Sequence, residues 1–220
     1  MHELEMDESI LDLIVRSRST ILEILENRGY SVDSYKSVGP DTIFKLATTN
    51  PDLLKIHGTR KLDDDKEENI YVLYWVDSAV RLRLEAEMNK LWDDENPAHY
   101  NPETDSIVIV LSEPFNEAFH VQAMKQWNAR KACVSFFHLK NLISNPAKHM
   151  YVPPHRKLNA EEVTDLMKGL HLKAKSELPH IKFHVDMQAR VLGLVPGDIV
   201  EITRPSETAG TYTLYRVCAM

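Results

Sequence analysis

Residues 201–220, EITRPSETAGTYTLYRVCAM, determine how the end of this 220-residue chain folds. Apolar, aromatic and β-branched residues recur through DIVEIT (198–203) and TYTLYRV (211–217), a composition that favours β-strands. The residues between the two segments are of the kind that turns require. The stretch is therefore predicted to be a β-hairpin in a small sheet.

The predicted turn, Arg204–Gly210, contains residues with defined backbone roles. Pro205 restricts φ and lacks an N–H, Ser206 can accept a hydrogen bond from an N–H two or three residues further on, and Gly210 tolerates a positive φ. A purely structural connection accounts for these three residues but leaves Arg204 and Glu207 unexplained. Because a guanidinium pairs well with a carboxylate, we expect this rigid turn to be presented at an interface.

The composition is that of a globular protein. Apolar residues make up 43% and charged residues 27%, and no apolar run approaches the roughly 18 residues of a membrane span. The start, MHELEMDES, is acidic and has no apolar core of a secretory signal, so we expect no membrane association. Cys133 and Cys218 lack a CxxC partner, which fits a reducing compartment and provides no zinc site.

Charge is distributed unevenly along the chain. The net charge is -7, yet residues 118–160 contain no Asp or Glu and carry seven positive charges and four histidines. The remainder therefore carries -14. Such a basic segment faces either an anion or an acidic partner, or is simply a solvated surface.

The first 148 residues are predicted to form a sheet with helices packed on it. Apolar spacing predicts a helix over about 8–28, with Asp7 as its cap and Gly29 as its stop. Further helices are expected from the stripe Val80–Leu91 and over 115–130. Strands are expected at TIFKLA (42–47), IYVLYWV (70–76), SIVIVLS (106–112) and ACVSFFHL (132–139). The last two, joined by a crossover helix, are predicted to be parallel.

A proline-rich stretch, ISNPAKHMYVPPHRKL (143–158), marks the predicted boundary between domains 1–148 and 149–220. In the second domain Asn159 and Glu162 form a predicted capping box for a short helix. The alternation in HIKFHV (180–185) predicts a strand. A second short helix is expected between Asp186 and Gly193, followed by a turn at VPGD (195–198). The fold class is thus mixed α+β.

Three motifs of the C-terminal third resemble the fifth-largest subunit shared by eukaryotic nuclear RNA polymerases, called H in archaea. They are VPPHRKLNAEEV (152–163), LPHIKFHVDMQARVLGLVPGDIVEI (178–202) and RPSETAGTYTLYRV (204–217). The order of motifs is consistent over about 70 residues. The first 148 residues resemble the family more loosely, through a helix ending in RGY (28–30) and through SIVIVLSEPFNEAFHVQAMKQW (106–127).

The resemblance implies an N-terminal jaw domain of nuclease-like fold beside downstream DNA, and a C-terminal assembly domain on the largest polymerase subunit. It implies a non-catalytic subunit of a DNA-directed RNA polymerase, without a cofactor or metal of its own and without obligate homo-oligomers, located in the nucleus. Where the family's jaw turn usually reads Thr-Pro-Ser-Ala, this chain has EPFNEAFH (113–120). A divergent homologue, encoded by a cell or by a large DNA virus with its own transcription compartment or virion, fits this departure.

The resemblance and the residue types together select candidate site residues. Tyr and Arg are enriched at binding hot spots, although alternate residues of one strand must face the core. The candidates for partner binding are Arg204, Pro205, Ser206, Glu207, Thr208, Gly210, Tyr212, Tyr215 and Arg216. The candidates near nucleic acid are Lys125, Arg130 and Lys131.

Catalytic and metal-binding interpretations have less support in the residues. Ser206 and Glu207 are adjacent, so they rarely face each other, and no nucleophile elbow precedes the serine. His180 and His184 are predicted on one face of a strand about 13 Å apart. They are therefore expected to be a surface pair, without other metal ligands.

Two alternative functions remain open. Asp41, Asp105 and Glu113 are carboxylates at possible strand ends and could hold Mg²⁺ in a degenerate nuclease-like protein, although no lysine lies two residues beyond any of these acids on the same strand. A stand-alone transcription adaptor would instead bind nucleic acid through its basic segment, with steep salt dependence.

Overall fold

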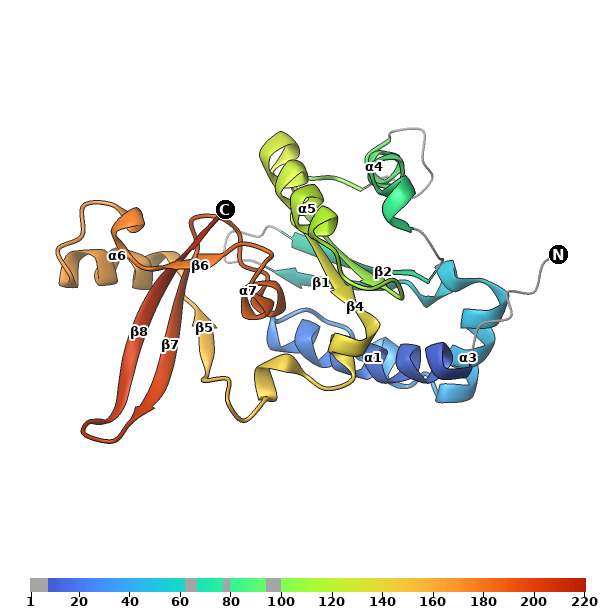
Figure 1. Ribbon diagram of the computed structural model, residues 1–220, viewed down its shortest axis with the longest axis horizontal. Coiled ribbons are helices and arrows are strands. Elements are labelled where there is room, and N and C mark those ends of the chain that lie inside the picture. The colour runs from blue at the N-terminus through green and yellow to red at the C-terminus, as the bar shows by residue number, and fades with distance from the viewer. Residues whose placement is uncertain (1–7, 62–66, 77–79, 94–99) are drawn as a thin grey trace. The chain divides into compact units, whose positions relative to one another are not determined.

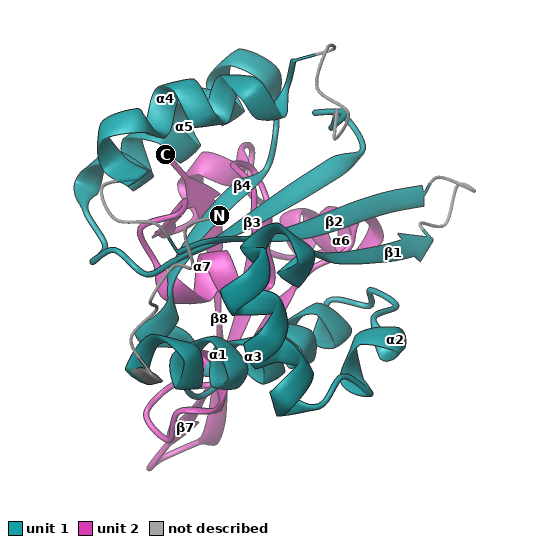
Figure 2. Cartoon of the chain, turned by 90° about the vertical axis from the view of Figure 1, so that its right-hand side faces the viewer, with its two compact units in different colours: residues 1–145 teal, residues 146–220 magenta. Residues whose placement is uncertain are grey.

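The computed structural model describes residues 8–61, 67–76, 80–93 and 100–220 (Figure 1). The chain divides into two compact units, Met1–Asn145 and Pro146–Met220 (Figure 2). The division falls within the proline-rich stretch, three residues before the predicted boundary at 148/149.

The first unit is built on a four-stranded sheet of order β1-β2-β3-β4. Its strands are β1 (Ile56–Lys61), β2 (Glu67–Trp75), β3 (Asp105–Leu111) and β4 (Val134–His138). β1 is antiparallel to β2, whereas β2, β3 and β4 are mutually parallel. The predicted parallel strand-helix-strand unit is confirmed, with α5 (Glu117–Arg130) as its crossover helix.

Helices cover both faces of this sheet (Figure 1). Ile107, Ile109 and Leu111 of β3 pack in one core with residues of α4 (Val80–Leu91) and α5. Val108 and Val110 point to the opposite face, on the side of α1 (Glu8–Asn27) and α3 (Pro40–Thr49), and are equally buried. Covering on both faces explains why SIVIVLS is a continuous apolar run.

The helix α1 follows the prediction closely. It ends at Asn27, and Gly29 with φ +84° turns the chain away. Its apolar face is buried through Ile14, Ile21 and Leu25. The predicted cap, Asp7, lies outside the described residues.

One prediction in this unit is wrong, and one strand was not predicted. TIFKLA forms the middle of α3, because Pro40 begins a helix and Ile43 and Ala47 are buried one turn apart. The edge strand β1, with the sequence IHGTRK, was not predicted, because it is short and polar. The unit also contains α2 (Asp33–Lys36) and the 3₁₀ turns η1 (Pro51–Leu54) and η2 (Leu139–Leu142).

The second unit has a four-stranded sheet of order β5-β7-β8-β6. Its strands are β5 (His155–Lys157), β6 (His180–Lys182), β7 (Ile199–Ser206) and β8 (Gly210–Ala219). β7 is antiparallel to β5 and to β8, while β6 runs parallel to β8. α6 (Ala160–Gly169) covers one end of one face, where its Val163 and Leu166 pack on Ile199 and Val217.

Local signals in this unit were predicted correctly. The Asn159 side chain accepts the Glu162 N–H and the Glu162 carboxylate accepts the Asn159 N–H, each at 2.9 Å. Asp186 caps α7 (Met187–Leu192), and Gly193 ends it with φ +64°. The unit also has 3₁₀ turns η3 (Pro146–Lys148) and η4 (Lys175–Glu177).

The predicted strand over 180–185 is only half correct. β6 ends at Lys182, and His184 has φ +59° in the turn that follows. His184 is 1% exposed while His180 is exposed, so the two histidines do not share a surface. The strand ends early because the Val185 N–H donates to the Phe183 carbonyl at 2.7 Å and the Asp186 N–H donates to the Lys182 carbonyl at 3.2 Å, which closes this turn.

None of the helices in the described ranges is long and apolar enough to cross a membrane.

Candidate functional site

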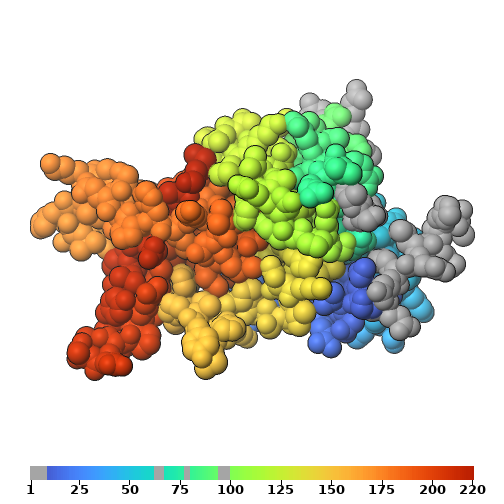
Figure 3. All heavy atoms as spheres, in the orientation of Figure 1, coloured from blue at the N-terminus to red at the C-terminus, as the bar shows by residue number. Residues whose placement is uncertain are grey.

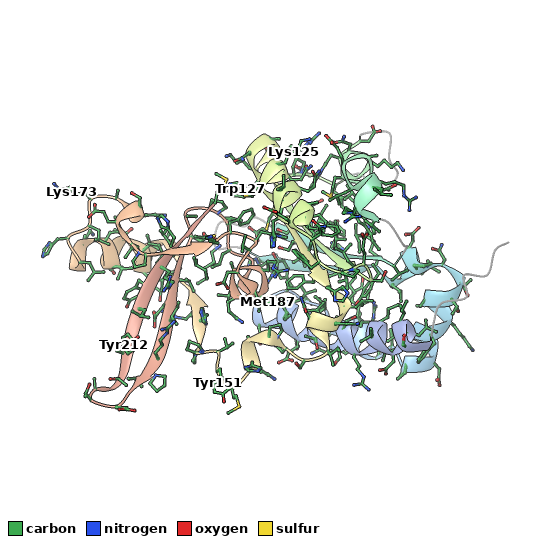
Figure 4. All side chains as sticks on the ribbon, viewed as in Figure 1. Lys125, Trp127, Tyr151, Lys173, Met187 and Tyr212 are labelled. Atoms are coloured by element: carbon green, nitrogen blue, oxygen red, sulfur yellow. The ribbon has the colours of Figure 1, made fainter. Side chains whose placement is uncertain are left out.

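The β7–β8 hairpin continues well beyond the part of the sheet that is covered by other elements (Figure 1). Ile199 and Val217 at its base are buried, whereas along the hairpin tip, which we define as 204–213, nearly every residue is exposed. Tyr212, an aromatic residue of this tip, is 43% exposed (Figure 4). The hairpin tip therefore contributes little to the core of its own unit.

The register of the hairpin divides the candidate residues between two faces. Arg204 pairs with Tyr212 and Ser206 with Gly210, so these side chains lie on one face together with Arg216. Pro205 and Tyr215 lie on the other face.

Two of the candidates have structural roles. Tyr215 is half-buried against the core under α6. The guanidinium of Arg216 donates to the carbonyl of His180 in β6, with a distance of 2.8 Å. The expectation that part of this strand serves the core is confirmed for Tyr215.

The connection is shorter than the predicted loop. Arg204, Pro205 and Ser206 belong to β7, and Glu207–Ala209 alone form the turn, because strand pairing persists to Ser206 and Gly210. The Ser206 hydroxyl accepts the Ala209 N–H at 3.3 Å, as predicted. Gly210 has φ +74°, which confirms the need for glycine at this position.

Arg204 and Glu207 remain available for a partner. Both side chains are exposed, and neither makes an ion pair or hydrogen bond with any residue in the described ranges. Thr208 is also exposed, and its hydroxyl lies 3.4 Å from that of Ser206. The hairpin tip thus presents an exposed guanidinium and an exposed carboxylate.

A groove of 450 Å³ lies on the Arg204 face of the sheet. Arg204 and Arg216 line it together with three residues that the sequence did not single out for binding: His155, His180 and Lys182. We call it the basic groove. Its acidic lining residue, Asp186, accepts the Gln188 N–H at 2.8 Å as a helix cap. The missed residues come from β5 and β6, each only three residues long, and only strand pairing brings them beside β7 and β8.

The candidates near nucleic acid lie on and after α5, whose residues form part of the surface in Figure 3. Lys125 forms an ion pair with Glu85 of α4 and thereby lowers the pKa of that carboxyl below its usual value. Lys131 has φ +59° and places its ammonium 5.6 Å from the ring centre of Trp127 (Figure 4). Arg130 is exposed in the last turn, where a positive charge also favours the helix dipole.

The three carboxylates considered for Mg²⁺ do not converge. Asp41 lies in α3, Asp105 begins β3 and Glu113 follows its end. The strand β3 between the last two, Asp105–Leu111, alone spans about 20 Å. Asp105 instead accepts hydrogen bonds from Asn69, Asn101 and Thr104 at 2.9–3.0 Å. Within the described ranges no three potential His, Cys, Asp or Glu ligands gather at one point.

Comparisons with known proteins agree with the motifs. Residues 144–218 match the family model described as RNA polymerase Rpb5, C-terminal domain. The chain is 29% identical over 209 residues to the Dictyostelium discoideum protein named DNA-directed RNA polymerases I, II, and III subunit rpabc1, covering 94% of this chain and 98% of that protein. It is 28% identical over 213 residues to the subunits named RPABC1 of Caenorhabditis elegans and Caenorhabditis briggsae. In both cases 92% of this chain and 93% of the relative are covered.

The predicted resemblance is therefore confirmed over the C-terminal unit and extends through most of the chain. Residues 144–218 are thus similar to the C-terminal domain of RNA polymerase Rpb5, and most of the chain is similar to proteins named as subunits of DNA-directed RNA polymerases.

Proposed function

We propose that this chain is a non-catalytic subunit of a DNA-directed RNA polymerase and works in the nucleus. The observation that supports this most strongly is the extent of similarity. The matches to relatives named as polymerase subunits cover 92–94% of this chain and 93–98% of those relatives. The dispersed carboxylates of the first unit support a structural rather than a nucleolytic role.

The second unit anchors the chain on the largest polymerase subunit through its hairpin tip. A hairpin exposed on both faces is stabilised by a partner that covers it, and Arg and Tyr are frequent anchors at such interfaces. Arg204 and Glu207 supply opposite charges without intramolecular partners among the described residues. We therefore expect a carboxylate of the partner to pair with Arg204 and an ammonium or guanidinium of the partner to pair with Glu207.

The first unit lies beside downstream duplex DNA in the assembled enzyme, with Lys125, Arg130 and Lys131 facing it. The exposed charge of Arg130 supports this proposal most directly. Lys125 and Lys131 already have intramolecular partners, so their contribution to DNA binding is smaller than a count of charges indicates.

The test is purification of the tagged full-length chain from its source cells, or from infected cells if the gene is viral, with mass spectrometry of the bound chains. The wild-type protein is expected to recover the two largest polymerase subunits. The double variant Arg204→Ala/Glu207→Ala is expected to remain folded and to lose them. The matched control, Glu161→Ala/Lys168→Ala, removes two exposed charges of α6 in the same unit and is expected to bind normally.

If the wild-type chain is recovered alone, or with nucleic acid only, the proposal that it is a polymerase subunit is wrong. If the Arg204→Ala/Glu207→Ala variant recovers the polymerase at the wild-type level, the proposed role of the hairpin tip is wrong, while the subunit assignment stands.

A further inference from the structure

Toward its tip, the hairpin has two outer edges that are not paired with another strand in the described part of the chain. β5 pairs with β7 only as far as Ile202, and β6 pairs with β8 only from Val217 onwards. Within the described ranges, the outer sides of 204–206 and 210–216 therefore face no other strand. Unpaired edges are sites where another chain can add a strand.

Hydrogen bonds at the base of the hairpin show which backbone groups face outward. The Val217 N–H donates to the Pro179 carbonyl of the neighbouring segment at 2.9 Å, so Val217 points outward on β8. Outward and inward residues alternate in an antiparallel ladder. The N–H and C=O groups of Tyr215 and Thr213 therefore also point to the outer edge of β8.

The two edges are protected unequally. On β7, Thr203 donates to the Pro154 carbonyl at 3.1 Å, and the next outward residue is Pro205, which has no N–H. Proline is one of the devices that block strand addition. On β8, the Thr211 N–H closes the turn by donating to Ala209 at 2.9 Å, whereas the N–H groups of Thr213 and Tyr215 have no partner in the described part of the chain.

The sequence of the open edge favours pairing. The segment Thr211–Tyr215 contains only Thr, Tyr and Leu and therefore carries no charge. Thr and Tyr are enriched in β-strands, and Leu is compatible with them. Thr213 is exposed, so an approaching backbone meets no obstacle there. An edge of this kind is a liability in a free protein and indicates that it is covered in the assembly.

Charge selects the occupant of this edge. The face of the hairpin that carries Arg204 and Arg216 continues into the basic groove, which His155 of β5 also lines. A second copy pairing edge to edge about a two-fold axis normal to the sheet would place both basic faces on the same side, where like charges repel. A segment with carboxylates on alternate residues would instead be attracted.

We propose that the outer edge of β8 at Thr213 and Tyr215 accepts an extended, acidic segment of a polymerase partner chain, whose alternate side chains carry carboxylates on the face of Arg204 and Arg216. This inference rests on the proposed function and defines the chemistry of the partner.

Backbone hydrogen exchange with single-amide resolution tests the pairing. The full-length chain is compared free and within the purified polymerase. Exchange at Thr213 and Tyr215 is expected to slow at least about tenfold on assembly. The neighbouring inward amides of Tyr212 and Leu214 are already paired with β7 and serve as internal references.

The outcomes separate this inference from the proposed function. If the chain enters the polymerase and the amides of Thr213 and Tyr215 exchange as in the free chain, strand addition is wrong and the subunit assignment stands. If the chain enters no polymerase, both fail. Dimers of the free chain that already protect these two amides would identify a second copy as the occupant and overturn the proposal.

A backbone substitution gives an independent test. Thr213→Pro removes the outward donor and leaves the inward ladder intact, so recovery of the polymerase is expected to fall about tenfold. Thr213→Val keeps the N–H and the branched shape and is expected to bind like wild type. Equal recovery with a folded Thr213→Pro variant would overturn the proposal.

Zero-length carbodiimide coupling of the polymerase tests the acidic chemistry. In the variant Arg204→Lys, position 204 is expected to couple to an Asp or Glu of the partner segment, whereas the wild-type guanidinium does not couple and serves as the control. If position 204 of this variant couples only within its own chain, the proposed carboxylates are not there.

Discussion

At the scale of single residues, the most reliable predictions concern side chains that bond to the backbone a few positions away. The capping box of Asn159 and Glu162, the cap at Asp186 and the Ser206 hydrogen bond in the turn all occur as expected. Each depends only on neighbours within three residues, so no tertiary context decides it.

The capping box makes one prediction at this scale. Asn159→Ala removes the acceptor of the Glu162 N–H and is expected to lower the free energy of unfolding by about 1 kcal/mol. Asn159→Asp retains an acceptor and is expected to be close to wild type. Urea unfolding followed by circular dichroism measures both. Equal destabilisation by the two variants would show that the side-chain acceptor is not what matters.

At the scale of elements, helix and strand assignments are correct where the burial of the element appears in its own pattern. β3 and α1 have clear apolar patterns and are found where predicted. TIFKLA was misassigned because its β-branched and aromatic residues resemble those of a strand, whereas Pro40 and the spacing of Ile43 and Ala47 make it a helix.

The strand β1 was missed because its stability comes from pairing rather than from its own residues. Its six residues pair with β2, and Gly58 allows the segment at 30–32 to approach closely. A Cβ at position 58 would lie 3.0 Å from Val32 Cγ1, 3.1 Å from Ile70 Cγ2 and 3.2 Å from Tyr30 Cβ. All three neighbours are buried, so none has room to move.

Gly58→Ala is therefore expected to lower the free energy of unfolding by about 1–3 kcal/mol. Lys61→Ala, on the same strand but exposed, serves as the control and is expected to change it by less than about 0.5 kcal/mol. Thermal and urea unfolding of the full-length chain measure both. A Gly58→Ala variant as stable as wild type would mean that this close approach can relax without cost.

At the scale of the whole molecule, the distribution of charge determines how strongly the free chain binds nucleic acid. The net charge is -7, and within the basic segment Lys125, Arg156 and Lys157 form ion pairs with carboxylates. Three of the seven cations of this segment are therefore already paired and contribute less to neutralising phosphates.

The isolated chain is expected to bind duplex DNA weakly, with a slope of log K against log salt no steeper than about -2 to -3, which corresponds to two or three phosphates. Fluorescence anisotropy at several salt concentrations measures the slope. A slope much steeper than this, removed by Lys125→Ala/Arg130→Ala/Lys131→Ala, would support the stand-alone adaptor instead.

The hairpin tip and the basic groove differ in how many of their residues could be selected from the sequence. The hairpin and its turn residues are contiguous in the chain, so Arg204, Glu207 and Tyr212 could be selected from the sequence and the family resemblance. The basic groove could not, since His155, His180 and Lys182 come from segments 25 residues apart that meet only through β7 and β8. Nor does the sequence alone give the separation of Asp105 and Glu113, because that distance depends on the extended course of β3 between them.

The sequence by itself determined the mixed α+β class, the family resemblance, the capped helices and the hairpin with its rigid turn, because these depend on composition, periodicity and bonds between near neighbours. Tertiary structure alone decided which strands lie side by side, which face each candidate residue occupies, and that the edge of β8 is open while Pro205 closes that of β7. These features depend on register and on segments distant in the chain, and a one-residue change of register would exchange both the faces and the outward N–H groups.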